Sequence, residues 1–284
     1  MQIKHFFDAA TFTLSYIVYD EASKDAVIID PLLDYEPQGA KITHQALEKL
    51  LMFIEEQRLN IRFILETHAH ADHLTGAQDL KKSFPDAILA IGEKITSVQS
   101  TFKKIFNLLE SFKTDGSQFD RLLKDNETVE AGTLSFKVMF TPGHTPACAS
   151  YLFRDALFVG DALFMPDYGT GRCDFPAGSA EDLYTSIKEK IYSLPPTVRI
   201  FVCHDYQPNG RKLAFETTVA EEKEKNIQLK ASTQKAEFIK FRSERDKTLS
   251  PPKLLLPSIQ VNIDAGKLPA PENNGQRYLK IPLS

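Results

Sequence analysis

The amino-acid sequence predicts an α/β fold, and two observations lead to this class. Short apolar runs, among them Ala26–Asp30, Ile61–Leu65 and Phe136–Phe140, have the length and composition of buried strands. They alternate along the chain with longer segments of helical periodicity, of which Gln45–Gln57 is the clearest. Strands that alternate with helices are typical of α/β proteins, in which helices cover the faces of a sheet.

The N-terminal part is expected to begin with two paired strands, Thr11–Tyr19 and Ala26–Asp30, the second of which ends at Pro31. The amphipathic helix Gln45–Gln57 should follow, and then the strand Ile61–Leu65. Residues 92–126 are longer than a usual connection. We expect them either to border a substrate mouth or to form a helical cover over the core.

The C-terminal part is predicted to contain a helix that begins at Ala180 and ends before Pro195. Phe215–Phe241 is a strongly charged stretch with helical composition, and the prolines that follow it predict an irregular tail. At 284 residues with 42% apolar content, the chain can bury one large core. We therefore expect one catalytic domain over residues 1–215, with residues 216–284 as a C-terminal helix and irregular tail packed on it.

Composition and charge exclude several classes of function. The net charge of −4 and the scattered basic residues provide no electrostatic stripe for nucleic acid. No run approaches the roughly 20 apolar residues of a membrane span, and the N-terminus lacks the apolar core of a signal peptide. Three cysteines do not make a disulfide framework. We expect a cytoplasmic protein in which Cys173 and Cys203 are buried as small apolar residues.

The run Thr67–His73 carries three of the seven histidines of the chain, His68, His70 and His73, together with Asp72. Two histidines separated by one residue cannot share a helix face, because helical neighbours lie three or four positions apart. They are therefore expected on an irregular loop after the strand Ile61–Leu65, before a helix that starts at Leu74. Four ligand-type side chains at such a junction predict a metal site.

Three further residues of ligand type follow apolar runs. His144 lies in a loop bounded by prolines after Phe136–Phe140, Asp161 ends the run that starts at Ala156, and His204 follows Arg199–Cys203. Each alone is a weak signal, because a histidine or aspartate after a strand is more often a cap or a turn residue. Together with the Thr67–His73 run they account for five of the seven histidines. We expect all of them to converge on one metal centre.

This ordered set of motifs, from His68-Ala69-His70-Ala71-Asp72-His73 through His144 and Asp161 to His204, resembles the metallo-β-lactamase superfamily in its glyoxalase II-like branch. The resemblance implies an αβ/βα sandwich of two mixed β-sheets with outer helices. A narrower resemblance comes from Gly171-Arg172-Cys173-Asp174-Phe175 and His204-Asp205-Tyr206, which look like elements of persulfide dioxygenases. Other segments resemble the bacterial β-lactamase-like hydrolase subgroup, some members of which carry a fused sulfurtransferase.

Two metal arrangements are compatible with these residues. In the first, His68, His144 and Asp161 hold one Fe(II) and leave three positions for O2 and a substrate sulfur. The other ligand-type residues then orient these ligands by hydrogen bonds; they are His70, Asp72, His73 and His204. In the second, two zinc ions occupy one site, with His68, His70 and His144 around one ion, Asp72, His73 and His204 around the other, and Asp161 bridging them. The number and type of ligands cannot choose between these arrangements, and a single zinc ion also stays open.

The elements around Arg172 and Tyr206 favour the iron-dependent persulfide dioxygenase, which oxidises glutathione persulfide with O2 to sulfite and glutathione. The alternative is a glyoxalase II-like thioester hydrolase. Expected catalytic residues are Asp72, Arg172 and Tyr206, and expected substrate-binding residues are Arg172, Tyr206 and Arg211. For Arg172 the structural alternative is an internal salt bridge with Asp174 or Asp161, and for Tyr206 it is aromatic packing. Another low-molecular-weight persulfide, a homodimer and a separate sulfurtransferase partner remain open.

Overall fold

The computed structural model of the chain describes residues 1–283, and these form two compact units. The first unit comprises Met1–Phe6, Ser15–Leu122 and the C-terminal residues from Pro251. The second unit comprises Phe7–Leu14 and Leu123–Ser250. The division predicted from the sequence, at residue 215, stays a prediction. In the described residues no helix has the length and the hydrophobicity that crossing a membrane requires.

The first unit is built on a six-stranded sheet with the order β1-β2-β3-β6-β8-β9. The sheet is mixed, because β2 and β3 are antiparallel whereas β3, β6 and β8 run parallel. A small sheet, β5-β4-β7, belongs to the same unit. The bounds of these strands are β1 Gln2–Asp8, β2 Thr13–Tyr19, β3 Asp25–Ile29, β4 Leu32–Glu36, β5 Lys41–Thr43, β6 Asn60–Glu66, β7 Leu74–Thr75, β8 Ile88–Gly92 and β9 Arg121–Leu123.

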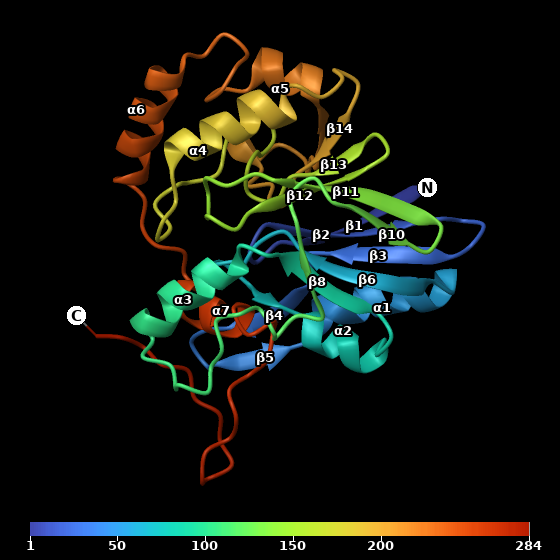
Figure 1. Cartoon of the computed structure of the whole chain (residues 1–284), viewed down its shortest axis with the longest axis vertical. Helices are drawn as coiled ribbons and strands as arrows, with labels where there is room; N and C mark the ends of the chain where they lie inside the picture. The colour runs from blue at the N-terminus through green and yellow to red at the C-terminus, as the bar shows by residue number, and fades with distance from the viewer. Residues whose placement is uncertain (284) are drawn as a thin grey trace. The chain divides into compact units, whose positions relative to one another are not determined.

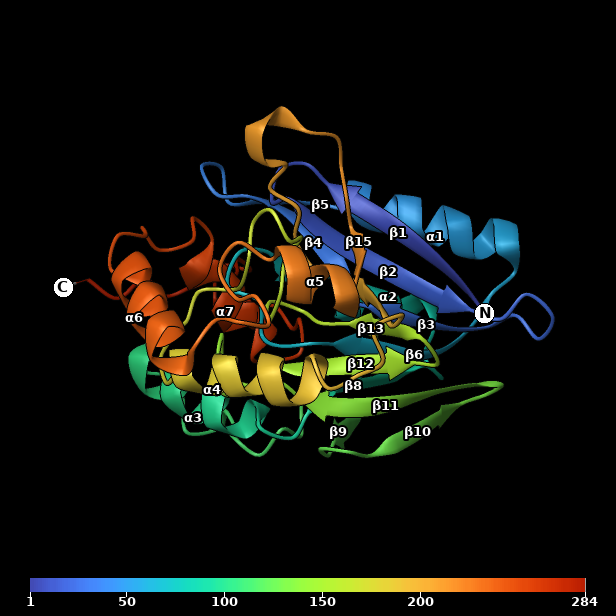
Figure 2. The ribbon, with the colours of Figure 1, turned by 90° about the horizontal axis from the view of Figure 1, so that it is seen from above.

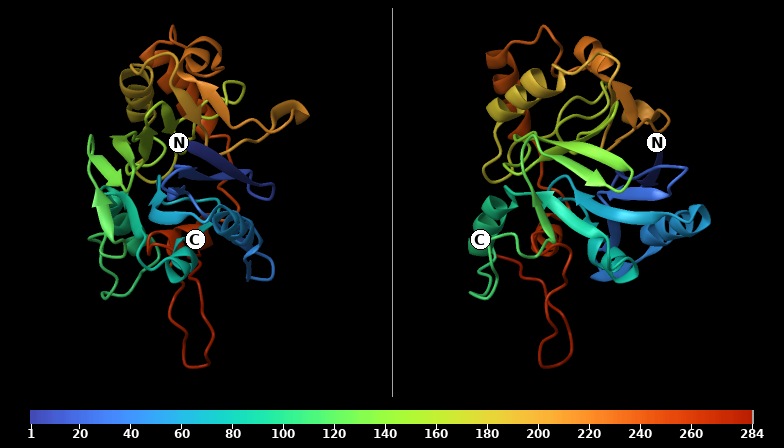
Figure 3. Two further views of the ribbon diagram at one scale, coloured as in Figure 1. Left: turned by 90° about the vertical axis from the view of Figure 1, so that its right-hand side faces the viewer. Right: turned by 45° about the vertical axis from the view of Figure 1, so that its right-hand side comes forward.

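The helices of the first unit are α1 (Gln45–Gln57), α2 (Ala77–Ser83), α3 (Ile95–Ile105) and α7 (Leu255–Asn262). Helix α1 has the predicted bounds; its buried face is apolar, and it ends where Arg58 adopts a left-handed conformation. Figure 1 shows α1 and α2 on the same face of the sheet that contains β3 and β6. After α7 the chain extends as a long loop, drawn in red in both panels of Figure 3.

The second unit contains a six-stranded sheet with the order β10-β11-β12-β13-β14-β15. It is also mixed, because β13 and β14 are parallel and the other neighbours are antiparallel. Helices α4 and α6 lie side by side in this unit (Figure 2). Its elements are β10 Thr128–Ala131, β11 Leu134–Phe140, β12 Ala149–Phe153, β13 Ala156–Phe158, α4 Ala180–Thr185 continued by a π-helical turn Ser186–Ile191, β14 Arg199–Phe201, β15 Glu216–Thr218, α5 Val219–Lys225 and α6 Lys235–Asp246.

The predicted α/β class with mixed sheets and outer helices is confirmed. Three local predictions are wrong. The helix expected from Leu74 begins only at Ala77, because Leu74–Thr75 pairs with β4 as a short strand. Phe215–Phe241 is not one helical stretch, since it contains β15 and two separate helices, α5 and α6. The tail is not wholly irregular, because Leu255–Asn262 forms α7, whose Ile259 and Val261 are fully buried.

Candidate metal centre

The histidine-rich run of the first unit forms the irregular loop predicted for it, after β6 and before β7. His68, His70 and His73 are buried, and their rings are packed in succession. The ring centroids of His68 and His70 are 4.1 Å apart, and those of His70 and His73 are 4.2 Å apart. Ligand atoms of His70, Asp72 and His73 all lie within 4.8 Å of one another. The loop therefore gathers imidazole and carboxylate groups densely enough to hold a cation.

A hydrogen-bond partner in the protein orients each of these rings. His68 Nδ1 lies 3.0 Å from Thr67 Oγ1, and His73 Nδ1 lies 3.1 Å from the Leu74 carbonyl oxygen. His70 is turned the other way, with Nε2 3.0 Å from Asp30 Oδ1. Metal-binding histidines commonly use one ring nitrogen for such a contact and the other for the metal. If these histidines bind a metal, this geometry favours Nε2 of His68 and His73, and Nδ1 of His70, as the coordinating atoms.

Two buried carboxylates, Asp30 and Glu66, face Nε2 of His70. Asp30 also accepts hydrogen bonds from the backbone N–H of Thr67 at 2.7 Å and from its hydroxyl at 2.9 Å. Glu66 Oε2 lies 3.4 Å from His70 Nε2, and its other oxygen accepts a bond from the Thr75 hydroxyl. Burial opposes ionisation of Asp30, but His70 and Thr67 together hold its pKa below the ordinary value. Burial raises the pKa of Glu66.

The second unit places the other three predicted ligands together, at the ends of its strands. Asp161 Oδ2 lies 3.6 Å from His144 Nε2, and Asp161 Oδ1 lies 3.4 Å from His204 Nε2. His144 Nδ1 is 2.7 Å from the carbonyl oxygen of Arg172, and His204 Nδ1 is 3.4 Å from the hydroxyl of Thr13. Both imidazoles thus direct Nε2 toward the same carboxylate. The two oxygens of Asp161 therefore face two different imidazole rings.

Two glycines permit the close packing around these ligands. Gly143, beside His144, has φ +144°, and a Cβ there would lie 2.4 Å from the Cα of Leu183. A Cβ on Gly171 would lie 1.9 Å from the carbonyl oxygen of Asp161. Because neither contact tolerates a side chain, both positions require glycine for the loops to approach.

Cys203 is a ligand-type residue that the sequence did not single out for metal binding. Its sulfur, an oxygen of Asp161 and a ring nitrogen of His204 lie within 4.8 Å of one another. Cys173 is also buried, and burial strongly raises the pKa of its thiol. The expectation that both cysteines are buried is confirmed.

The structure shows other partners for the side chains expected to bind substrate. Arg172 forms a bidentate salt bridge with Asp174, at 2.6 and 2.5 Å, and donates a third bond to the Ser250 carbonyl. This is one of the two structural alternatives predicted for it. Arg211 donates four hydrogen bonds of 2.5–2.9 Å to the carboxylates of Asp167 and Asp205.

Tyr206 belongs to an aromatic cluster in the second unit. Its ring stacks on that of Tyr168, at a centroid distance of 4.6 Å, and on the His204 imidazole at 5.7 Å. Phe12 and Phe164 also contact it, at 5.6 and 5.7 Å. This matches the aromatic packing that the sequence left open, and its proposed catalytic role stays a prediction.

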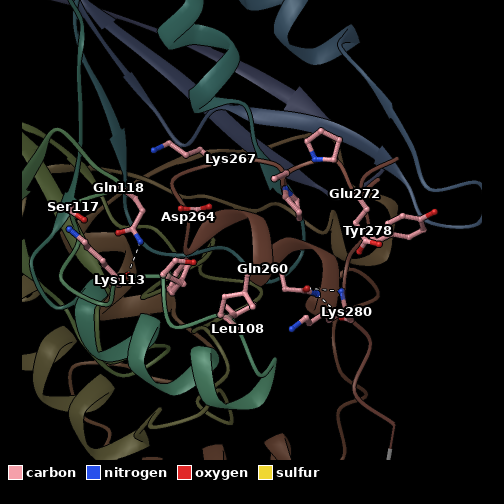
Figure 4. A pocket seen from close by; sticks show the side chains of 16 residues that line it. Leu108, Lys113, Ser117, Gln118, Gln260, Asp264, Lys267, Glu272, Tyr278 and Lys280 are labelled. Carbon is pink, nitrogen blue, oxygen red and sulfur yellow. Dashed lines mark hydrogen bonds between the residues drawn. The ribbon is translucent and has the colours of Figure 1, made fainter. Parts of the chain in front are cut away.

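A hollow of about 700 Å³ lies in the first unit between the segment after α3 and the C-terminal residues. Its polar lining includes Lys113, Lys267, Asp264 and Tyr278, all labelled in Figure 4. None of the predicted metal ligands lines it. It is therefore separate from the histidine loop of the same unit.

Comparison with known proteins agrees with the superfamily that the sequence motifs resemble. The model of the metallo-β-lactamase superfamily matches residues 9–204. The chain is 52% identical to glyoxylase B2 of Dictyostelium discoideum, over all of this chain and 97% of that protein. It is 48% identical to a probable metallo-hydrolase of Burkholderia pseudomallei, and the match covers 100% of this chain and 99% of that protein. It is 31% identical to the human mitochondrial persulfide dioxygenase ETHE1, and the match covers 84% of this chain and 79% of that protein.

Among solved structures, ETHE1 from Myxococcus xanthus is similar to the chain with a TM-score of 0.74. The sequences are 30% identical, and the match covers 94% of this chain and 100% of that one. The likeness therefore extends over nearly the whole chain.

Proposed function

The chain belongs to the metallo-β-lactamase superfamily of metal-dependent enzymes, and from this premise we propose that it is a glyoxalase II-like hydrolase that cleaves a thioester at a two-metal site. The observation that carries the proposal is the position of Asp161, whose two oxygens face His144 and His204. A carboxylate so placed is suited to link two metal ions. Similarity to a glyoxylase and to a probable metallo-hydrolase over the full chain supports the hydrolytic reaction.

We propose two sets of ligands around Asp161, one of which is His68, His70 and His144 and the other Asp72, His73 and His204. Five imidazoles and two carboxylates form a nitrogen and oxygen donor set that suits zinc. Each imidazole has a partner on one ring nitrogen, so the opposite nitrogen is oriented for coordination. The residues present therefore fit a pair of zinc ions.

Metal ions in such a site lower the pKa of water and polarise a carbonyl oxygen when bound. The contribution of the protein is to fix the ligand side chains, so that little reorganisation is needed during the reaction. Asp72 is the least buried of the proposed ligands, and we propose that its carboxylate accepts the proton of the attacking water. Asp30 and Glu66 hold the His70 ring in place.

A second candidate is a persulfide dioxygenase with one Fe(II) held by His68, His144 and Asp161. The similarity to human persulfide dioxygenase favours it, as does the likeness to the structure of Myxococcus xanthus ETHE1. In this candidate glutathione persulfide, or another low-molecular-weight persulfide, reacts with O2. Arg172, Tyr206 and Arg211 remain the proposed substrate-binding residues, although the present bonds of both arginines would have to be exchanged for substrate contacts.

Metal analysis combined with two assays separates the candidates. Protein expressed without added zinc is analysed for iron and zinc, and then assayed for hydrolysis of a glutathione thioester and for O2 uptake with glutathione persulfide. Two metal ions per chain with thioester hydrolysis and no O2 uptake is the expected result. One iron per chain with persulfide-dependent O2 uptake would replace the hydrolase by the dioxygenase. Zinc at partial occupancy alone does not decide, because zinc outcompetes Fe(II) for such ligands.

His73→Ala should remove about half of the bound metal, because His73 is proposed to bind the second ion and not the first. In the one-iron arrangement, the same change should leave the metal bound and lower its affinity by roughly 10- to 100-fold. The measurement is metal content per chain after gel filtration. His44→Ala is the control, because the His44 side chain is 51% exposed and lies outside the ligand loop.

A further inference from the structure

Asn262 is the last residue of α7, and it is buried with 3% of its surface exposed. Its side-chain amide donates to the backbone carbonyl of His70 and to that of His73, both at 2.8 Å. Its amide oxygen accepts a bond from the backbone N–H of Thr75 at 2.9 Å. A single side chain therefore holds the histidine loop at three points.

These three points surround the part of the loop that carries Asp72 and two of the proposed imidazole ligands. The carbonyls of His70 and His73 belong to the irregular segment before β7, and leaving a buried backbone group without a bond is costly. An asparagine side chain has two N–H donors in one amino group and one carbonyl acceptor. All three of these bonding positions are used here, so the requirement is for a carboxamide of this length.

The contact between Asn262 and Thr75 connects Asn262 to Glu66, the carboxylate beside the His70 ring. The Thr75 backbone is bonded to Asn262, while the Thr75 hydroxyl donates to Glu66. Glu66 in turn lies beside Nε2 of His70. Asn262 is thus connected to His70 in two ways. It binds the backbone carbonyl of His70 directly, and it binds Thr75, whose hydroxyl contacts the Glu66 carboxylate beside the His70 ring.

We propose that Asn262 is a positioning residue that sets the conformation of the histidine loop before metal binds. This inference rests on the proposed metal site. It adds a role for α7, which follows all of the proposed ligands in the sequence. A loop held in its binding conformation loses less conformational freedom when the metal is bound, which increases affinity. Asn262 touches no reacting atom, so its effect should be on metal affinity.

Other side chains bind the backbone of the same C-terminal segment. Gln78 Nε2 on α2 donates to the Ala265 carbonyl at 2.9 Å, and Gln99 Nε2 on α3 donates to the Ile263 carbonyl at 2.9 Å. Gln78→Ala is therefore a matched control. It removes one bond between a helix and the segment after α7 and leaves the backbone bonds of the loop intact.

The test uses Asn262→Asp, Asn262→Ala and Gln78→Ala in the full chain, with Zn²⁺ as the probe. Aspartate keeps the acceptor for Thr75 but places negative charge against two carbonyl oxygens. Alanine removes all three bonds without adding charge. Zn²⁺ affinity is measured by competition with a chromophoric chelator, and the melting temperature is measured on metal-free protein.

Both Asn262 variants are expected to lose roughly 10- to 100-fold in Zn²⁺ affinity, the usual effect of losing a group that orients metal ligands. Gln78→Ala should keep wild-type affinity. Equal affinity of Asn262→Ala and the wild type would overturn the proposal. Loss of folding in both Asn262 variants would also overturn it, since the role would then be structural. A wild-type protein without Zn²⁺ affinity would instead contradict the proposed function.

Discussion

At the residue scale, the site depends on which ring nitrogen of each histidine is hydrogen-bonded to the surrounding protein. His70 differs from His68 and His73, because its Nε2 and not its Nδ1 is held by the protein. This reversal follows from the loop, which presents one side of the His70 ring to Asp30 and Glu66. A carboxylate partner makes an imidazole a stronger ligand as well as orienting it.

Asp30→Asn should weaken Zn²⁺ binding by roughly 10- to 100-fold, because the neutral amide no longer supports the His70 ring with a full charge. Affinity is measured by competition with a chelator. Asp25→Asn is the matched control. Asp25 is also buried and lies at the start of β3, the strand that ends just before Asp30. Its partner, however, is Arg62 and not a histidine. If the two variants bind Zn²⁺ equally well, Asp30 has no role in holding the ligand.

At the scale of elements, the segment after Asp161 is fastened to the end of α6. Arg172 joins Asp174 and the Ser250 carbonyl, and the backbone N–H of Cys173 donates to Asp246 at 2.8 Å. The carbonyl of Arg172 in turn holds His144. The Arg172 side chain thus braces the segment whose backbone orients a proposed ligand, which is a different use from clamping a substrate carboxylate.

Arg172→Lys should lower the melting temperature and the metal content together, because lysine cannot reproduce the bidentate contact with Asp174. The pair is partly exposed, so the expected loss is about 1 kcal/mol or less, or a decrease of about 2–4 °C for a chain of this size. Melting temperature, metal content and KM are measured on the same preparation. Arg199→Lys is the control, because Arg199 forms a similar pair with Glu216. A raised KM with unchanged melting temperature would indicate a substrate clamp instead.

At the scale of the whole molecule, one buried acid should make stability depend on pH. Burial raises the pKa of Glu222, on α5, to about 8 from its ordinary value of 4.5. Between these two values the unfolded chain releases the proton while the folded chain keeps it. Stability therefore decreases as pH rises through this window, and the full loss is reached above the folded-state pKa.

Glu222→Gln should raise the melting temperature at pH 8 and have little effect at pH 4.5, because glutamine needs no proton to remain neutral. Its carbonyl oxygen can keep the bond that Asn226 now donates at 2.7 Å. The measurement is a series of thermal melts of metal-free protein across this pH range. Glu224→Gln, at an exposed position on the same helix, is the control for removing a carboxylate from α5. A Glu222→Gln effect that does not change with pH would contradict the assignment.

Part of this protein follows from local sequence alone. The bounds of α1, the strands that precede each proposed ligand and the irregular loop at Thr67–His73 were all predictable, because apolar periodicity and motif spacing act over a few residues. The candidate ligands were predictable for a similar reason, since their side chains follow apolar runs. The single helix expected over Phe215–Phe241 failed because charged composition favours helix without locating its ends. There, the side chain of Thr218 caps α5, and Glu216–Thr218 pairs with β14.

Contacts between residues far apart in the sequence were decided only by the tertiary structure. Asn262 lies 192 positions from His70, and no local pattern marks it as part of the site. Likewise, only the tertiary structure shows that Arg172 is bonded to Asp174 and to the Ser250 carbonyl, whereas its role toward a substrate stays a prediction. Sequence by itself determined which residue types could bind metal. Tertiary structure decided how they are oriented, because the hydrogen-bond partners of buried groups often lie far away in the sequence.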